Sequence, residues 1–390
     1  MVKGQEIVIV AVGVGAVVIS YMLGRYFSSS KRQSVRSGLS ELVGNTPLVY
    51  LGTISRLIGC EVYGKADFLN PGGSVKDRFA LRVARKAASE GFKGIVEATS
   101  GSTGISLTLA GLSLGLKSKI FVPDDQAPEK ISMLRSIGAS VQLTRPATIS
   151  DPGHMCKEAE RFSRENPEFY YTDQFENEEN FKVHYETTGP EILQDAPNLN
   201  VFVAAAGTGG AIAGISAYLK QALSRKVTCI LADVQGSALT SKINHGILYH
   251  SYDREGHRVK HPVDTVTEGI GLNRLTFNFE SGLKYVDSAI VVTDAEAVHM
   301  AYYLLHKEGL FLGSSTAVNC AAVVKAWKRG LIKPGSVVCT ILCDSGSRHL
   351  SKFWSHRFLD SKGLLPSFVD PVTGQVDDPS LIPDPLSFIE

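Results

Sequence analysis

The sequence has almost no net charge, because 40 lysines and arginines face 39 aspartates and glutamates, which leaves +1 over 390 residues. Without an excess of either sign, no overall field favours nucleic acid or another strongly charged partner. The six cysteines are scattered and lack the short paired spacings of zinc sites or disulfide frameworks. We therefore expect no nucleic-acid partner, no metal site and a reducing compartment.

Charge is missing altogether from residues 7–23, a run rich in valine, isoleucine and glycine. The run is near the lower limit of about 17–25 residues for a transmembrane helix and lacks a polar stripe. No cleavage site or arginine-rich presequence is visible, and four basic residues lie between positions 25 and 36. We therefore predict a single-pass membrane anchor and basic linker in residues 1–37, with the rest of the chain in the cytosol. The segment resembles signal anchors of the mitochondrial outer membrane; an endoplasmic reticulum anchor is the alternative.

The remaining chain alternates short apolar runs with stretches of helical periodicity, and it contains no internal repeat. The apolar runs predict strands at residues 95–98, 119–123, 140–144, 201–206, 228–234, 290–293 and 337–343. Such alternation is typical of α/β proteins with parallel-rich sheets, and almost wholly apolar strands indicate helices on both faces, a three-layer α/β/α arrangement. After residue 361, five prolines among acidic residues predict a tail that is unfolded or draped over the surface.

The most informative stretch is residues 70–78, Asn-Pro-Gly-Gly-Ser-Val-Lys-Asp-Arg. Its proline and glycines predict a turn, and Phe79, Val83 and Ala87 then recur at helical spacing. Lys76 is thus expected at the positive end of a helix, where the dipole and neighbouring cations lower the pKa of an ammonium group. Such a lysine suits covalent bonding to a carbonyl group. The alternative is a surface lysine that opens a helix.

Other turns between predicted strands and helices carry groups able to bind anions. Residues 206–211, Ala-Gly-Thr-Gly-Gly-Ala, follow a strand, and glycines there let backbone N–H groups converge on a phosphate. The pattern matches neither the dinucleotide fingerprint nor a P-loop, and a simple tight turn is the alternative. Residues 99–104, Thr-Ser-Gly-Ser-Thr-Gly, offer hydroxyls and amides for a carboxylate, or alternatively a helix cap.

Two further segments lie where ligands commonly bind. Asp344-Ser345-Gly346 ends the last apolar strand, and the carboxyl ends of strands are the usual binding edge of α/β sheets; a helix cap is the alternative for Ser345. The polar stretch 171–177 and the flexible turn 268–271, Glu-Gly-Ile-Gly, are loops on any interpretation.

These motifs, in this order from about residue 39 to residue 361, resemble the β-family of pyridoxal-phosphate enzymes. This family includes cysteine synthases, cystathionine β-synthases, serine and threonine dehydratases and threonine synthases. The sequence is most similar to membrane-anchored fungal cysteine synthases, which also have Ser-Thr-Gly in the loop of residues 99–104. The resemblance implies the two-domain fold-type II architecture of the tryptophan synthase β type. The large domain would comprise residues 38–78 and 186–361, and the small movable domain residues 79–185, followed by the tail, residues 362–390.

The resemblance also implies a role for each motif. Lys76 would carry pyridoxal 5′-phosphate covalently and act as the catalytic base. The other implied cofactor-binding residues are Ser102, Gly207, Thr208, Gly209, Gly210, Ala211 and, facing the pyridine nitrogen, Ser345. The implied substrate-binding residues are Thr99, Ser100, Gly101, Thr103, Gln174 and Gly269. Two residues depart from the pattern: Ser102 replaces an asparagine and Ala211 a threonine.

By the same resemblance, the expected reaction is the replacement of the acetate of O-acetyl-L-serine, or of a related activated serine, by sulfide to give L-cysteine. The partners would be an amino-acid substrate, sulfide, the membrane and a second copy of the chain, since the family commonly forms dimers. The alternatives are a cysteine or serine lyase that releases pyruvate, and a cofactor-bound membrane-surface protein of low activity. A cystathionine β-synthase is also conceivable, although no room remains for a regulatory module after residue 361.

Overall fold

The structure, a computed structural model, describes residues 35–224, 226–250 and 265–390. The predicted membrane anchor at residues 7–23 lies outside the described residues, and within the described ranges no helix is long and apolar enough to cross a membrane. The chain divides into two compact units, Met1–Glu41 and Leu42–Glu390. In the first unit, the described part contains the 3₁₀-helix η1 (Leu39–Glu41), and the Ser37 hydroxyl donates to Glu41 Oε1 at 2.6 Å.

The second unit contains a six-stranded sheet with the strand order β1-β2-β10-β7-β8-β9. Its strands are β1 (Leu48–Tyr50), β2 (Glu61–Lys65), β7 (Val201–Ala205), β8 (Thr228–Val234), β9 (Ser288–Val292) and β10 (Val337–Ile341). All neighbouring pairs are parallel except β1 with β2. The parallel-rich sheet agrees with the pattern of buried apolar runs. Strands β1 and β2 were not expected, because β1 has only three residues and β2 carries charged residues at both ends.

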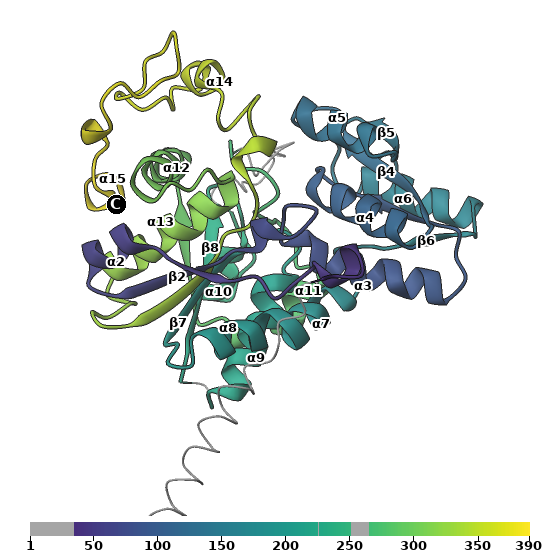
Figure 1. The fold of residues 1–390 in the computed structure, drawn as a ribbon, viewed down its shortest axis with the longest axis horizontal. Helices are drawn as coiled ribbons and strands as arrows, with labels where there is room; N and C mark the ends of the chain where they lie inside the picture. Colours follow the sequence, from purple (N-terminus) through teal and green to yellow (C-terminus); the bar gives the residue numbers. More distant parts are fainter. Residues whose placement is uncertain (1–34, 225, 251–264) are drawn as a thin grey trace, which may run out of the picture. The chain divides into compact units, whose positions relative to one another are not determined.

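Side chains alternate between the two faces of this sheet, as strand geometry requires. Val201 and Val203 of β7 pack into one hydrophobic cluster, and Phe202 and Ala204 into another. Figure 1 shows the helices on the two sides. The first face is covered by α2 (Gly52–Ile58), α12 (Asp294–Glu308) and α13 (Ser314–Lys328), and the second by α8 (Gly189–Asp195), α9 (Gly210–Ala222), α10 (Leu239–His245) and α11 (Phe277–Gly282).

A second, four-stranded sheet has the order β5-β4-β3-β6, with all pairs parallel. Its strands are β3 (Gly94–Ala98), β4 (Lys117–Pro123), β5 (Ser140–Thr144) and β6 (Phe169–Tyr171). The clusters around it contain residues of α3 (Lys76–Ser89), α4 (Ser102–Ser113) and α5 (Pro128–Ser136) on one face and of α6 (Met155–Glu165) on the other. All seven predicted strands therefore occur, and the three-layer arrangement is confirmed for both sheets. The predicted domain boundaries stay a prediction, since residues 42–390 form one unit.

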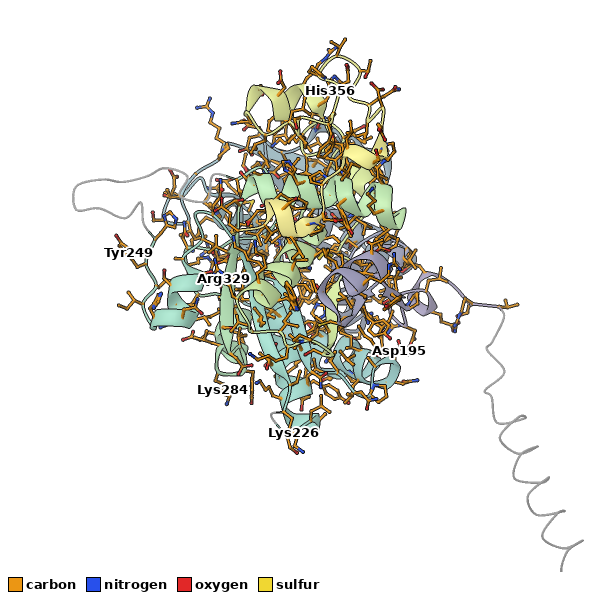
Figure 2. All side chains as sticks on the ribbon, turned by 90° about the vertical axis from the view of Figure 1, so that its left-hand side faces the viewer. Asp195, Lys226, Tyr249, Lys284, Arg329 and His356 are labelled. Atoms are coloured by element: carbon orange, nitrogen blue, oxygen red, sulfur yellow. The ribbon has the colours of Figure 1, made fainter. Side chains whose placement is uncertain are left out.

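The remaining elements are short. They are η2 (Asp67–Leu69), α7 (Glu179–Val183), the π-helix η3 (His184–Thr188), η4 (Leu283–Tyr285), η5 (Gly346–Arg348), α14 (His356–Ser361), η6 (Pro379–Leu381) and α15 (Pro385–Phe388). Of the two alternatives for the tail, the structure shows the draped one, because Val369, Ile382 and Ile389 are buried in the cluster beneath α12 and α13. Charged side chains such as Lys226, Lys284 and Arg329 lie on the exposed surface (Figure 2).

Candidate active site

A cavity of about 1070 Å³ lies where strands of both sheets end. Its lining includes Thr99, which follows β3, Asp125, which follows the end of β4, and Gly207, which follows the end of β7. The carboxyl ends of parallel strands are the usual ligand-binding edge of α/β sheets. Most of the candidate residues found in the sequence meet in this cavity, although they come from turns far apart along the chain.

Lys76 lines the cavity as the first residue of α3. Gly73, with a φ of 74°, completes the predicted turn, and its N–H donates to the Asn70 carbonyl at 2.7 Å. Desolvation lowers the pKa of the Lys76 amine, although the nearby Cys343 and Asp344 oppose the shift. In the described chain no carboxylate lies within ion-pair distance of this amine. The predicted direction of the pKa shift is confirmed, and its main cause is burial.

The residue after Lys76 is anchored inside the protein. The Asp77 carboxylate accepts hydrogen bonds from the Gly72 N–H and from the Ser106 hydroxyl of α4. Burial raises the pKa of Asp77 to about 6, although these hydrogen bonds oppose the shift. A side chain at Gly72 would displace the Asp77 carboxylate, because a Cβ atom would lie 2.5 Å from Asp77 Oδ1. This contact holds the turn of residues 70–75 against the start of α3.

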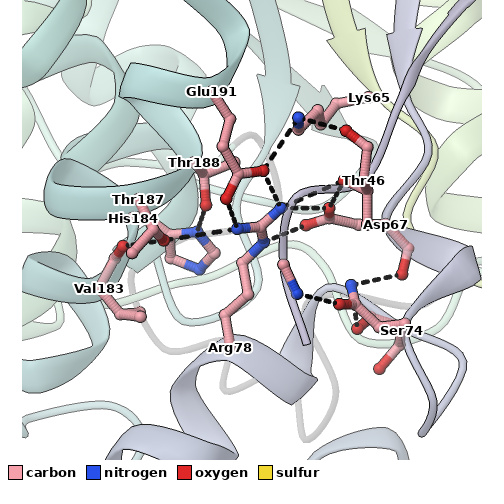
Figure 3. Close-up of polar contacts among 12 residues, drawn as sticks. Thr46, Lys65, Asp67, Ser74, Arg78, Val183, His184, Thr187, Thr188 and Glu191 are labelled. Atoms are coloured by element: carbon pink, nitrogen blue, oxygen red, sulfur yellow. Dashed lines mark hydrogen bonds and ion pairs between the residues drawn. The ribbon is translucent and has the colours of Figure 1, made fainter. Parts of the chain in front are cut away.

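The next residue, Arg78, belongs to a buried network of charges that we call the anchor network (Figure 3). Its guanidinium donates to both carboxylate oxygens of Asp67 at 2.9 and 3.0 Å and to both of Glu191 at 2.7 and 2.8 Å. Lys65, which is fully buried, contacts Glu191 at 2.9 Å and the Thr46 carbonyl. Burial alone would raise the pKa of Asp67, but the charge of Arg78 outweighs it and the pKa lies below its ordinary value. None of these residues lines the cavity.

The glycine-rich turn 207–211 leads from β7 into α9, as expected. Gly209 has a φ of 89° and caps α9 without a side-chain hydrogen bond, so the first amides of the helix have no acceptor within it. The turn admits no side chains at its glycines: a Cβ on Gly207 would lie 2.2 Å from the Gly269 carbonyl oxygen, and one on Gly209 2.4 Å from Phe279 Cβ. Gly207, Thr208, Gly209 and Ala211 line the cavity, while Gly210 packs against Asn180. This is a cradle of backbone donors sized for an anion.

The hydroxyl-rich turn 99–103 lies across the cavity and begins α4. Its cap is Gly101, which has a φ of 130° and no side-chain cap bond, so the alternative of a hydroxyl helix cap is not observed. Thr99, Ser100, Ser102 and Thr103 line the cavity. The Thr103 hydroxyl donates to Gln174 Oε1 at 2.7 Å, which joins the turn to the loop after β6. Gln174 lines the cavity as well.

The loop 268–271 closes another side of the cavity and is held against the glycine-rich turn. The Gly271 N–H donates to the Ala206 carbonyl at 2.9 Å, and both Gly269 and Gly271 have positive φ, 78° and 89°. Glu268 and Gly269 line the cavity. Gly269 thus lies in the same cavity as most of the other candidate residues, and its place beside the substrate stays a prediction.

Ser345 is not among the residues that line the cavity, whereas the two residues before it, Cys343 and Asp344, are. Strand β10 ends at Ile341, and Ser345 then caps η5, where its hydroxyl accepts from the Ser347 N–H at 3.3 Å. The helix cap is thus observed, and the contact of Ser345 with the pyridine nitrogen stays a prediction. Ser315, near the start of α13, lines the cavity and hydrogen-bonds the Cys343 thiol. Sequence reasoning missed Ser315, because paired serines opening a helix are also typical of plain caps.

A second buried charge cluster, which we call the rim cluster, was also missed. The Lys130 amine of α5 forms an ion pair with Glu268, and His349 lies 3.2 Å from Glu268 and 3.1 Å from Asp344. All four residues line the cavity, as does Lys352, 3.5 Å from Glu268. These contacts join α5, beside the four-stranded sheet, to residues that follow strands of the six-stranded sheet. No local sequence signal marks the cluster, because its members are 76 or more residues apart except for those at 344–352.

Opposite charges set the ionisation of the rim cluster. Burial lowers the pKa of His349, but Asp344 and Glu268 outweigh it, and the net pKa lies above the ordinary value. Burial raises the pKa of Glu268, but the His349 hydrogen bond and the Lys130 charge outweigh it, and the net pKa is lowered. The pKa of Asp344 is lowered for the same reason, by His349. The cluster therefore favours a protonated imidazole between two carboxylates.

A lysine of lowered pKa, an amide cradle for an anion and a hydroxyl-rich turn in one cavity are the parts of an enzyme that uses a phosphorylated carbonyl cofactor. The comparison with known families agrees. Residues 39–344 match the family described as pyridoxal-phosphate dependent enzymes, and the chain belongs to this family. Pyridoxal phosphate is therefore the cofactor, as predicted.

Three relatives make the similarity more specific. The chain is 40% identical to "Cysteine synthase 2" of Schizosaccharomyces pombe over the whole of both chains. It is 47% identical to "Cysteine synthase 2" of Neurospora crassa, over 82% of this chain and 73% of that one. It is 42% identical to the "Putative mitochondrial cysteine synthase" of Saccharomyces cerevisiae, over 86% and 88%.

Among solved structures, the chain is similar to the O-acetylserine dependent cystathionine β-synthase of Helicobacter pylori. The TM-score is 0.70 at 31% identity, over 82% of this chain and 98% of that one. The expected fold-type II architecture is thereby confirmed. Membrane anchoring is not among the properties that these comparisons address.

Proposed function

We propose that the chain catalyses β-replacement on an activated serine, such as O-acetyl-L-serine, with sulfide as the nucleophile and L-cysteine as the product. The observation that carries this proposal is the amine of Lys76, which lies desolvated in one cavity with an anion cradle and a hydroxyl-rich turn. The names of the relatives, several of them cysteine synthases, support the same reaction.

The residues present fit the cofactor. Lys76 would hold it covalently, and the amides of residues 207–211 would bind its phosphate, because the cradle offers unpaired donors in a space that a Cβ would fill. Ser102 would donate to the ring oxygen, and Ser345, or the cavity-lining Ser315, would be the hydroxyl partner of the ring nitrogen. When bound, pyridoxal phosphate withdraws electrons from the substrate and makes its α-hydrogen acidic.

The chain itself would supply orientation and proton transfer. The amides and hydroxyls of residues 99–103, together with Gln174, would bind the carboxylate of the amino acid. The Lys76 amine would take the proton from Cα and return it after sulfide has replaced acetate at Cβ. The rim cluster, which joins Lys130 to Glu268 beside the cavity, would hold the two sheets together and keep water from the reaction.

Replacing the lysine tests the proposal most directly. The purified wild-type protein should show the visible absorbance of lysine-bound cofactor and form cysteine from O-acetylserine and sulfide. Lys76→Ala should lose this absorbance and lower kcat at least about a hundredfold, since a positioned acid–base group contributes 10²–10⁴-fold. Borohydride reduction followed by peptide mapping should find the pyridoxyl label on Lys76. A label on another lysine would contradict the assignment.

One alternative reaction is supported by a specific residue. Ser102, which lines the cavity where the family commonly has asparagine, has a shorter reach, so a lyase that releases pyruvate is the second candidate. Incubating the enzyme with O-acetylserine, serine and cysteine without sulfide should yield little pyruvate if the synthase proposal is correct. Homocysteine should be tested as a second thiol, because the similar Helicobacter pylori enzyme is titled a cystathionine β-synthase. No turnover with any of them would favour the low-activity surface protein.

We also propose that residues 7–23 anchor the protein in a membrane, with the catalytic part in the cytosol. The support is the uncharged run itself and the basic residues after it. The mitochondrial outer membrane is the first candidate and the endoplasmic reticulum the second. Alkaline carbonate should leave the full-length protein in the membrane pellet and release a form that lacks residues 1–30. A homodimer, the common state in the family, would be checked by light scattering in detergent.

A further inference from the structure

A buried carboxylate with no assigned task lies beneath the hydroxyl-rich turn. Glu97 is the fourth residue of β3, whose residues are all buried, and it is 1% exposed. Among the described residues no lysine, arginine or histidine forms an ion pair with it. Acidic residues are almost never fully buried unless they are paired, so a carboxylate in this position requires an explanation.

Three donors from two segments converge on this carboxylate. Glu97 Oε1 accepts from the Ala98 N–H at 2.7 Å, and Oε2 accepts from the Thr172 hydroxyl at 2.6 Å and the Gln174 N–H at 3.0 Å. Burial raises the pKa of Glu97 to about 8, while the three hydrogen bonds oppose that shift. Thr172 and Gln174 follow β6, so the carboxylate bridges neighbouring strands at the edge where the cavity opens.

The residue between these two donors has an unfavourable backbone conformation. Asp173 has a φ of 43°, one of three positive values at non-glycine residues in the described chain. The left-handed conformation costs roughly 1–2 kcal/mol for an L-residue, although aspartate tolerates it better than most. Glu97 holds both neighbours of Asp173, and the turn therefore keeps a shape that the local sequence alone would not favour.

The turn directs Gln174 into the cavity. The side chain of Gln174 donates to the Ala98 carbonyl at 2.7 Å and accepts from the Thr103 hydroxyl at 2.7 Å. Gln174 and Thr103 both line the cavity and are two of the groups proposed to bind the substrate carboxylate. Glu97 does not line the cavity, so it acts on the site only through Gln174 and its neighbours.

We propose that Glu97 is a positioning residue that determines the affinity of the enzyme for the α-carboxylate of its substrate. It does so by fixing the strained turn 172–174 and thereby the place of Gln174 beside Thr103. This inference rests on the proposed function, since it assumes that an amino acid bound to the cofactor reaches residues 99–103 and Gln174.

The test compares two ligands that differ only in the carboxylate, L-serine and 2-aminoethanol. Both amines can react with the cofactor of the full-length holoenzyme, and the change in visible absorbance reports binding without turnover. In Glu97→Gln, an amide N–H₂ replaces one of the two accepting oxygens and faces donors. The half-saturating concentration of L-serine should rise about tenfold or more, as for the loss of a hydrogen bond at a charged group, and that of 2-aminoethanol should stay within twofold.

Asp233→Asn is a closely matched control. Asp233, 2% exposed, also accepts from the N–H of its following residue, from a threonine hydroxyl and from a further backbone N–H. Like Glu97 it does not line the cavity, but its partners, Val234 and Thr240, do not line it either. It should lower thermal stability as Glu97→Gln does, without changing the ratio of the two affinities. If Glu97→Gln does not fold, Thr172→Val removes one of the three donors and should raise the value for L-serine alone, by about threefold to tenfold.

The outcomes separate the two proposals. An equal change for both ligands in Glu97→Gln and Thr172→Val, or no change for either, overturns the role of Glu97 while the proposed function stands. A wild-type protein that contains the cofactor but shows no spectral response to L-serine contradicts the proposed function, and the role of Glu97 with it. A selective loss for L-serine supports both.

Discussion

The anchor network and the rim cluster are both built from buried charges, but they differ in how completely those charges are paired. In the anchor network, Arg78, Asp67 and Glu191 satisfy one another at 2.7–3.0 Å, and no side-chain atom of theirs is left without a partner. In the rim cluster, Asp344 Oδ1 and Glu268 Oε1 are buried without a hydrogen bond. The anchor network lies outside the cavity, and the rim cluster lines it.

The same contrast appears in one buried histidine beside each region. His184 lies near the anchor network, where burial and the charge of Arg78 lower its pKa to about 3. In the rim cluster, the carboxylates Asp344 and Glu268 raise the pKa of His349. We infer that fully satisfied charges support the fold, whereas charges left partly unsatisfied at a cavity serve binding and closure.

The largest effect that would test this difference is expected from Arg78→Met. It leaves Asp67 without its buried cation, so the free energy of unfolding should fall by about 3–5 kcal/mol. Denaturant unfolding measures the loss. Arg82→Met, on the same helix, is the control: its pairs with Glu179 and Glu186 are partly exposed and should contribute about 1 kcal/mol or less. If Arg78→Met keeps its stability and loses only activity, the conclusion that the anchor network supports the fold is wrong.

A smaller effect on stability, but a clear one on activity, is expected from Lys130→Met. Glu268 keeps Lys352 and His349 nearby, so the fold should lose less than in Arg78→Met. Because Lys130 joins α5 to the loop 268–271 beside the cavity, kcat/KM should fall roughly tenfold, or about 1.4 kcal/mol of transition-state stabilisation. Lys157→Met removes an exposed lysine beside the same sheet and should leave activity unchanged. Equal losses of kcat/KM in Lys130→Met and Lys157→Met would contradict the role given to the rim cluster.

The smallest effect is expected in the pH dependence of stability. The pKa of His349 is raised in the folded protein, so its contribution is fully present below about pH 6.5 and is lost as pH rises through the higher folded value. His349→Gln should flatten the fall of the melting temperature above about pH 6.5. His184→Gln should lower the melting temperature equally throughout this range, because His184 is already neutral. If His349→Gln and His184→Gln lower the melting temperature by the same amount at every pH, the anchor network and the rim cluster do not differ in this property.

Much of the site could be predicted because it consists of local motifs. The turn before Lys76, the glycine cradle at 207–211 and the hydroxyls at 99–103 each carry their signal within a few neighbouring residues, and strand periodicity places them at one edge of a sheet. Ser315 was missed by the same reasoning, since no local pattern shows that it reaches the cavity from α13. Because Ser315 belongs to α13, nothing in the sequence around β10 indicates that it reaches the site.

By itself, the sequence determined the alternation of strands and helices, the family and the lysine proposed to bear the cofactor, because these follow from periodicity and short contiguous motifs. Only the tertiary structure decided which buried charges meet. Lys130 and Glu268 are 138 residues apart, and Glu97 and Gln174 are 77 apart. Coulombic attraction and hydrogen bonding depend on distance in space, and burial strengthens both, so the roles of these residues become visible only when the two sheets are in place.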